Sequence, residues 1–198
     1  GINSGIIKNL GLDNINIKGQ RAVGGLVGYN VGGNISNVYV SGIVSGGDLD
    51  GTGGLVGYNS GGSIKNAYAT ANVTSTNTYN GGLVGSNTGS IENSYATGAV
   101  SSSSSSSSSY AGGLVGQNTG AITNSFWNTE TTGQSISSGS GIGLTTAQMQ
   151  NLNTFTGVGW DISGVGGENT VWRIYEGQTA PLLRSFLTQA IINPTDKT

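Results

Sequence analysis

Apolar and polar positions along the chain repeat with a period of about 28 residues, and each repeat contains two fixed blocks. The first block is Gly-Gly-Leu-Val-Gly, and the second is Ile-x-Asn-x-Tyr, with Phe replacing Tyr in the last copy. The first begins at Gly24, Gly53, Gly81 and Gly112, and the second at Ile35, Ile64, Ile91 and Ile122. Self-similarity at such a period is typical of solenoids, propellers and arrays.

In the second block, fixed positions alternate with positions that vary freely. The residue after the Ile is Ser36, Lys65, Glu92 or Thr123, so it changes in size and in charge sign. Such alternation is typical of a strand with one buried face and one solvent-facing face. We therefore predict that the variable residues face solvent. The recurring Ile and the recurring aromatic residue should face a core together, the aromatic set being Tyr39, Tyr68, Tyr95 and Phe126.

The two residues that follow the pentapeptide behave differently from each other. The first of them varies between Tyr29, Tyr58, Ser86 and Gln117, so we place it on the solvent-facing side. The second is always asparagine, at Asn30, Asn59, Asn87 and Asn118, and a glycine-containing turn follows it. Asparagine and glycine tolerate left-handed backbone angles, which suits a corner. Asparagines stacked in successive coils also predict a ladder of side-chain amides.

A third short strand, ending in valine, follows the second block in Gly42-Ile-Val44, Ala71-Asn-Val73 and Gly98-Ala-Val100. Three strands in about 28 residues are too few for a propeller blade, which needs four strands and roughly 40 residues. They match one turn of a parallel β-helix, with equivalent strands stacked about 4.8 Å apart. The crossover rule favours a right-handed coil. We therefore predict an all-β chain that forms a right-handed parallel β-helix, or β-solenoid.

We expect this solenoid to occupy residues 1–132, with a partial first coil followed by four coils that carry the pentapeptide. Because the chain begins within a repeat, we expect it to be a piece of a longer protein. The sequence before each later pentapeptide varies and includes the serine run Ser101–Ser109. Insertions at one corner of a solenoid form loops on one face. We expect the serine run to be a tolerated low-complexity loop, with a glycosylated or partner-contacting loop as the alternative.

The period ends after Asn128, and a different pattern follows. Thr145 and Gln148 fit a capping box, which predicts one short helix that ends near Leu152. Aromatic residues absent from the repeats come next, among them Trp160 and Trp172. Because the end of a solenoid exposes unpaired strand edges, terminal units usually cover them. We predict that residues 133–187 form such an aromatic cap, or a bridge to another module, and that residues 188–198 are a linker.

The repeat resembles the GLUG motif of bacterial surface proteins, in which Gly-Gly-Leu-Val-Gly precedes Ile-x-Asn-Ser-Tyr-Ala-Thr-Gly. The tail is similar to the segments that often follow such repeats, and the resemblance covers about residues 4–185. Its tail motifs are Ser125-Phe-Trp-Asn, Gly143-Leu-Thr-Thr-Ala-Gln-Met149, Gly159-Trp-Asp-Ile, Trp172-Arg-Ile-Tyr-Glu-Gly-Gln and Pro181-Leu-Leu-Arg184. The resemblance implies a β-solenoid segment of a secreted or surface-displayed protein, such as a filamentous-haemagglutinin-like adhesin. It transfers no catalytic residues.

Charge and composition exclude several functions. Charged residues make up 8% of the chain and the net charge is −2, which leaves no basic footprint for nucleic acid or for an acidic membrane surface. No apolar run approaches the roughly 18 residues that span a membrane, so we expect no direct membrane insertion. The chain has neither His nor Cys. A Ser-His-Asp triad, a cysteine nucleophile and a His-ligated zinc are therefore impossible within it.

The remaining candidate chemistry is weak. Asp48-Leu-Asp50-Gly-Thr52 resembles the start of a calcium loop, but the later bidentate acid is missing, and we expect a solvated polar loop. The nine acidic residues do not gather on one repeated face, as a glycosidase pair would require. We expect no catalytic residue, no metal and no cofactor. Tyr29, Tyr58 and Tyr110 are the candidate partner contacts.

These observations favour a non-catalytic structural and interaction module of a large secreted bacterial adhesin. Its β-solenoid stalk would serve attachment to a host or bacterial surface receptor, either protein or glycan, and it would adjoin neighbouring modules of the same chain. We expect it to be secreted or on the cell surface. The alternatives are a spacer or exosite module of a secreted immunoglobulin-A-type metallopeptidase, or a carbohydrate-active β-helix. Flanking sequence would discriminate, because a downstream His-Glu-x-x-His helix indicates the protease.

Overall fold

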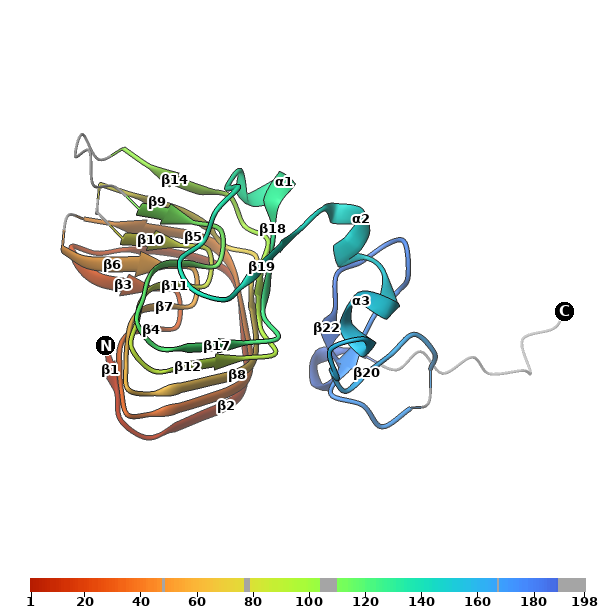
Figure 1. Ribbon diagram of the computed structural model, residues 1–198. Coiled ribbons are helices and arrows are strands. Elements are labelled where there is room, and N and C mark those ends of the chain that lie inside the picture. Colours follow the sequence, from red (N-terminus) through yellow and green to blue (C-terminus); the bar gives the residue numbers. More distant parts are fainter. Residues whose placement is uncertain (48, 77–78, 104–109, 167, 189–198) are drawn as a thin grey trace, which may run out of the picture.

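The computed structural model describes residues 1–188 apart from 48, 77–78, 104–109 and 167. Most of the described chain is a parallel β-solenoid, whose turns lie side by side (Figure 1). Equivalent residues of successive turns stand opposite each other, as Ile35 stands opposite Ile64 and Ile64 opposite Ile91. The predicted all-β fold and the spacing of about 28 residues between turns are confirmed.

Three parallel sheets form the solenoid. The flank sheet contains β1 (Ile2–Asn3) and the strands that follow the pentapeptide leucines, in the order β1, β4 (Val27–Val31), β7 (Val56–Ser60), β11 (Val84–Asn87) and β16 (Val115–Asn118). The arm sheet contains the strands before those leucines: β3 (Arg21–Gly24), β6 (Leu49–Gly53), β10 (Tyr79–Gly81) and β15 (Tyr110–Gly112). The two sheets meet at the Gly-Leu bend of each turn.

The main sheet carries the rest of each turn. It contains β2 (Ile6–Lys18), β5 (Asn34–Gly46), β8 (Ser63–Ala69), β9 (Asn72–Ser75), β12 (Ser90–Glu92), β13 (Tyr95–Ala96), β14 (Val100–Ser102), β17 (Ala121–Thr123), β18 (Phe126–Asn128) and β19 (Ile142–Leu144). Its members include the second block and the third strand of each turn. The third strands run past the valines at which they were predicted to end, to Ser75 in β9 and to Ser102 in β14, and β14 begins only at Val100.

The arm sheet differs from the sequence prediction, which treated the pentapeptide as one strand and assigned the residues before it to variable loops. The pentapeptide is instead divided between an arm strand and a flank strand. Three of those loops end in a short strand that begins at Leu49, Tyr79 or Tyr110. The serine run also begins within a strand, because Ser101 and Ser102 belong to β14. Residues 104–109 of that run lie outside the described part of the chain.

The solenoid core is formed by the stacked aliphatic residues of the two blocks. Leu55 and Leu83 are fully buried, and Ile64 and Ile91 are each 1% exposed. Lys65 lies next to Ile64 on the same strand but points outward, where its Nζ lies 2.9 Å from Glu92 Oε1. The predicted inward position of the leucines and isoleucines and the outward position of the variable residues beside the isoleucines are confirmed. The predicted solvent-facing position of Ser86 is wrong, because Ser86 is only 3% exposed.

A ladder of asparagine side chains runs through the turns beside this core. Each Nδ2 donates to the Oδ1 of the next asparagine, over 2.7 Å from Asn3 to Asn30, 2.8 Å to Asn59, 2.7 Å to Asn87 and 2.7 Å to Asn118. Asn30 and Asn59 are fully buried. Burying amides is favourable only when their hydrogen bonds are made, and the stacking meets that condition. The predicted amide ladder is confirmed.

The recurring aromatic residues do not face the solenoid core, which corrects the sequence prediction. The asparagine in the middle of each second block has a positive φ, such as 52° at Asn37 and 51° at Asn66. Asparagine adopts this left-handed conformation more readily than most residues. The kink shifts the strand alternation by one, so Val38 and Val40 join the isoleucines in the core. Tyr39 and its equivalents therefore point out of the coil.

The segment after the period ends has two parts, and the first covers the last turn. Helix α1 (Thr129–Thr132) leads into residues 134–144. There Gly113 N donates to Ile136 O over 2.9 Å, and Ser138 N donates to Val115 O over 3.0 Å. Strand β19 then pairs with β18. The segment predicted to be a polar connection therefore forms part of a further turn over the strand edges.

The second part, residues 145–186, is named the lateral cap. It contains α2 (Thr146–Met149), α3 (Leu152–Thr156), a small sheet of β20 (Ile162–Ser163), β21 (Trp172–Arg173) and β22 (Leu182–Leu183), and the 3-10 helix η1 (Arg184–Phe186). The capping box of Thr145 and Gln148 is present. Helix α2 ends at Met149, and Asn151 caps the second helix, which the sequence analysis did not separate. None of the described helices could cross a membrane.

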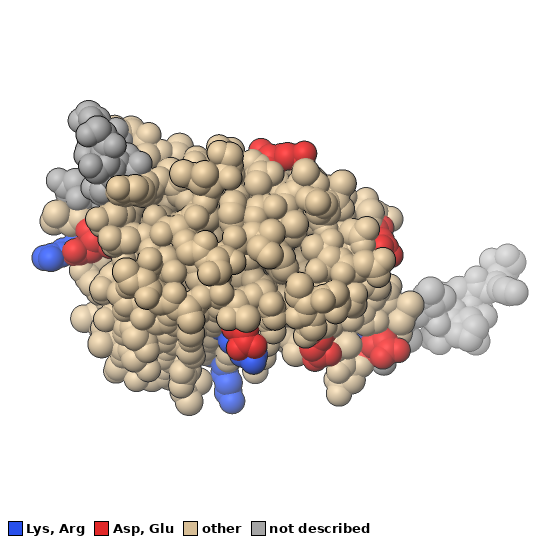
Figure 2. Space-filling view, viewed as in Figure 1, with Lys and Arg blue, Asp and Glu red and all other residues tan. Residues whose placement is uncertain are grey.

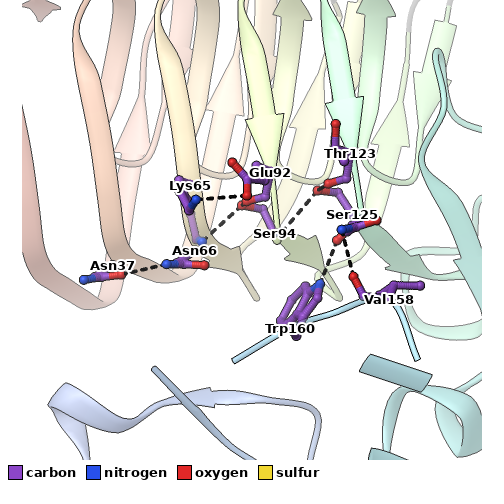
Figure 3. A network of polar contacts seen from close by, with 11 residues as sticks. Asn37, Lys65, Asn66, Glu92, Ser94, Thr123, Ser125, Val158 and Trp160 are labelled. Carbon is purple, nitrogen blue, oxygen red and sulfur yellow. Dashed lines mark hydrogen bonds and ion pairs between the residues drawn. The ribbon is translucent and has the colours of Figure 1, made fainter. Parts of the chain in front are cut away.

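The lateral cap lies against the side of the solenoid, where it buries the outward-facing aromatic row (Figure 1). The ring of Trp172 lies 6.0 Å from the rings of both Tyr68 and Tyr95. The Tyr95 hydroxyl donates to Pro181 O over 2.6 Å. Figure 3 shows Trp160 reaching the solenoid, where its Nε1 donates to Asn124 O over 2.9 Å. The aromatic cluster therefore covers the outer face of the main sheet, whereas the prediction placed it over the end of the solenoid.

Candidate functional site

The candidate contact surface is the region where the arm sheet crosses the flank sheet, and it carries the predicted contact residues Tyr29, Tyr58 and Tyr110. A Cβ atom on Gly57 would overlap the backbone of Ala22, and one on Gly116 would overlap the backbone of Asn80. The last glycine of the pentapeptide recurs because the two backbones touch there and leave no room for a side chain. Gly57 belongs to the turn after Ala22, so each arm strand lies over the flank strand of the next turn.

Tyr29 and Tyr58 form a pair of rings on the flank sheet. Their centroids lie 5.9 Å apart at an interplanar angle of 75°, an edge-to-face contact. The Tyr29 hydroxyl donates to Asp50 Oδ2, and Arg21 Nε donates to the same oxygen. Asp50 itself has a left-handed φ of 67°. The arm and flank sheets are thus joined by one carboxylate at this pair.

These contacts fix the charge of the Asp50 carboxyl group. The hydrogen bond from Tyr29, followed by the one from Arg21, lowers the pKa of Asp50 below its ordinary value. The bond to Asp50 also raises the pKa of the Tyr29 phenol. Asp50 is therefore a carboxylate anion that accepts hydrogen bonds from two side chains of the same chain, Tyr29 and Arg21. Asp48, the other acid of the segment that resembles the start of a calcium loop, lies outside the described residues.

Charge is sparse around the candidate contact surface. Figure 2 shows only a few, widely spaced charged spots on this face of the molecule, some of which combine a basic with an acidic side chain. Within the described part of the chain, no three His, Cys, Asp or Glu side chains come together closely enough to hold a metal ion. Apart from the Arg21–Asp50 ion pair, chemistry at this surface therefore depends on aromatic rings and on neutral hydrogen-bonding groups.

Tyr110 belongs to a second aromatic pair, on the arm sheet. Its ring is stacked on Tyr79 with centroids 6.0 Å apart and an interplanar angle of 19°. Tyr110 is 54% exposed. The sequence analysis missed Tyr79, although a signal was present. Each tyrosine stands two residues before a pair of glycines, in Tyr79-Asn-Gly81-Gly and in Tyr110-Ala-Gly112-Gly, so the position recurs between turns.

A cavity of about 350 Å³ opens beside Tyr110 at the end of the arm sheet. It is lined by the arm, the flank and the covering segment, through Tyr110, Ala111, Gly112, Gly116, Gln134, Ile136, Ser137 and Ser138. Ile136 is 66% exposed and adds an apolar surface to that of Tyr110. The cavity therefore combines an accessible ring with amide, hydroxyl and backbone groups.

The structure places the three predicted contact residues in two separate pairs. Tyr29 and Tyr58 contact each other on the flank sheet, and Tyr110 contacts Tyr79 on the arm sheet. The Tyr29 hydroxyl is already bonded within the chain, whereas the Tyr110 ring is largely open to solvent. As partner contacts these residues stay predictions, and Tyr110 has the most accessible ring of the three.

One comparison with known proteins gives a match. A family model described as the GLUG motif matches residues 19–45, 50–74 and 76–101. These segments belong to three successive turns, and the fourth turn carries the same two blocks outside the matched residues. No curated protein and no solved structure matches the chain. The chain therefore contains GLUG-motif repeats, and here these repeats are turns of a β-solenoid.

Proposed function

We propose that this chain is a non-catalytic structural and interaction module of a large secreted bacterial adhesin. In this proposal the solenoid is a stalk on the cell surface or on a secreted protein. The supporting observation is the use that the fold makes of the recurring side chains. Asn59 links two neighbouring turns through its amide, and Leu55 and Ile64 are buried in the core. The repeated residues thus build a rod.

Attachment would then depend on the positions that vary between turns. Lys65 and Glu92 occupy equivalent places on neighbouring turns, and so do Ser36 and Lys65. These residues differ in charge and size while the core beneath them stays the same. These outward residues would contact a surface receptor, either protein or glycan, and they can vary without changing the core of the rod. The low charge predicts attachment that depends little on salt.

Deleting one whole turn tests the stalk directly. Removal of residues 54–81 takes out 28 residues and joins Gly53 to Gly82, which restores an intact Gly-Gly-Leu-Val-Gly. We expect the shortened chain to keep a cooperative melt and a β-rich circular dichroism spectrum. Its long axis should shrink by about 4.8 Å, the spacing of one strand, which scattering in solution would measure. Loss of the folded state would show that the turns are not interchangeable parts of a rod.

The attachment half of the proposal needs a separate assay. Beads coated with the full 198-residue chain should adhere to epithelial or bacterial cells more than beads coated with albumin. Soluble chain should compete with them. The turn-deleted chain should adhere equally well if its contact surface lies in the retained turns. Adhesion no greater than that of albumin, or turnover of a polysaccharide panel by the chain, would contradict a non-catalytic attachment module.

A further inference from the structure

We propose that the cavity beside Tyr110 binds a neutral sugar unit of a glycan. This inference deepens the proposed function and rests on it, because it gives the attachment module a ligand class and a place. Its starting point is the arrangement of one open aromatic ring, one exposed aliphatic side chain and several neutral polar groups around a cavity of about 350 Å³. Ligand cavities are commonly about 300 to 1,000 Å³ in volume.

The aromatic part of the cavity suits the face of a pyranose. Tyr79 supports the Tyr110 ring from behind at a centroid distance of 6.0 Å, so the ring is held while it stays 54% exposed. The face of an aromatic ring is electron-rich, and the C–H groups on one face of a sugar present a weakly positive apolar surface to it. Ile136 extends the same apolar surface.

The polar part offers both donors and acceptors to hydroxyl groups. Gln134 Nε2 donates to Val100 O over 2.8 Å, which holds the carboxamide in place and keeps its oxygen as an acceptor. Ser138 Oγ accepts from Asn118 N over 3.0 Å and keeps its own hydrogen as a donor. A sugar hydroxyl both donates and accepts, so this mixed set matches it.

The backbone of β15 adds a further pair of groups. Gly112 O accepts from Gly82 N over 3.2 Å, so the polar groups of Gly112 face the neighbouring strand. Backbone groups of alternate residues point in opposite directions along a parallel strand. Ala111 therefore turns its N–H and C=O toward the free edge of the arm sheet, where the cavity lies. Such an edge is a ready hydrogen-bonding surface.

The absence of charge in the lining decides between ligand classes. None of the eight lining residues is Asp, Glu, Lys or Arg, so an acidic sugar, a phosphate or a peptide terminus would lose its hydration without a counter-charge. An extended peptide could pair with the edge at Ala111. That edge ends at once, because the N–H of Gly113 is already bonded to Ile136 O over 2.9 Å. A neutral sugar fits these groups better than a peptide strand.

Saturation-transfer NMR with the full chain tests the proposal. The probes are neutral oligosaccharides of glucose, galactose, mannose and N-acetylglucosamine, with sialyl and sulfated oligosaccharides for comparison. We expect at least one neutral probe to bind and the acidic probes to bind more weakly. For that probe, calorimetry should show that Tyr110→Ala weakens affinity by about 2- to 12-fold, the scale of one lost aromatic contact. Tyr110→Phe should keep the affinity, because the ring remains.

Two controls keep the outcome interpretable. Tyr175→Ala removes an exposed aromatic ring of the lateral cap, outside the cavity, and should leave the affinity unchanged. Ile136→Ala truncates an exposed side chain that the fold does not need, and it should weaken binding even if Tyr110→Ala disturbs β15. The proposal is overturned if no neutral probe binds, if acidic probes or extended peptides bind better, or if binding survives both cavity variants. Bead adhesion that persists in that case would retain the attachment module without this site.

Discussion

The asparagine ladder predicts a difference between the middle and the end of the solenoid. Asn59→Ala removes three hydrogen bonds: from Asn30 Nδ2 over 2.8 Å, to Asn87 Oδ1 over 2.7 Å and to Gly62 O over 3.1 Å. All three partner groups would be left in a site where Asn59 is fully buried. At roughly 1 to 3 kcal/mol for each buried group left unpaired, and with water able to enter the vacated space, we expect a loss of about 3 to 6 kcal/mol.

Asn118→Ala is the matched control at the end of the same ladder. It removes the bond from Asn87 Nδ2 over 2.7 Å and its own bond to Gly120 O over 2.9 Å. Asn118 is only half-buried, so water can replace part of what is lost. We expect its loss to be about 1 to 2 kcal/mol.

Urea unfolding, followed by circular dichroism, measures both free energies on one scale. Against a typical stability of roughly 5 to 15 kcal/mol, the difference between the two variants is large. Equal losses, within about 0.5 kcal/mol, would refute the reasoning. Each asparagine would then act only through its local bond to the backbone of its own corner, as Asn59 does to Gly62 O. The hydrogen bonds between successive turns of the solenoid would contribute nothing measurable.

Three further predictions concern the core, the lateral cap and pH. Ile64→Ala should lower the free energy of unfolding by about 2 to 5 kcal/mol, whereas Lys65→Ala should change it by no more than about 0.5 kcal/mol. Equal melting shifts would mean that the assignment of inward and outward side chains is wrong. Trp172→Ala should cost about 3 to 5 kcal/mol and expose Tyr68 and Tyr95, so binding of a hydrophobic dye should rise, and unchanged dye binding would argue against cap release. Burial raises the pKa of both phenols, so their contribution to stability is complete below the ordinary tyrosine value of about 10 and is lost as pH rises above it. In an ultraviolet absorbance titration, these two tyrosines should ionise only as the chain unfolds. A single transition of all eight tyrosines while the circular dichroism spectrum stays that of the folded chain would contradict this.

Comparison of the turns with one another predicted the parts of the fold that repeat. A position that stays Leu or Ile while its neighbour changes charge sign must be buried, and Ile64 and Lys65 show this. The amide ladder followed from the same logic, because an asparagine that recurs at a corner meets its equivalent one turn away. The fold class and the period therefore needed no information beyond the chain itself.

The errors arose where one residue altered the geometry or where contacts join distant parts of the chain. Counting alternate positions assumes an extended backbone, and the left-handed φ of 52° at Asn37 breaks that assumption. Asparagine is a poor strand former, so its recurrence inside a strand was the available signal. The contact of Trp172 with Tyr68 joins residues about a hundred positions apart, and no local pattern indicates such a partner. The Tyr110 cavity joins residues of the last repeat to residues 134–138, which lie beyond the period, so comparison of the turns could not indicate it.

The lateral cap has a mechanical consequence for the rod. Hydrogen bonds between turns run along its axis, so a pull on its two ends would peel the turns off one after another. Each released turn of 28 residues could lengthen to roughly 90 to 100 Å, compared with about 4.8 Å in the rod. The cap clamps successive turns together, because Phe186 contacts Tyr39, Trp172 contacts Tyr68 and Tyr95, and Phe155 contacts Phe126. Under tension the rod should stay stiff until this clamp detaches, and then extend as a long tether that absorbs the load.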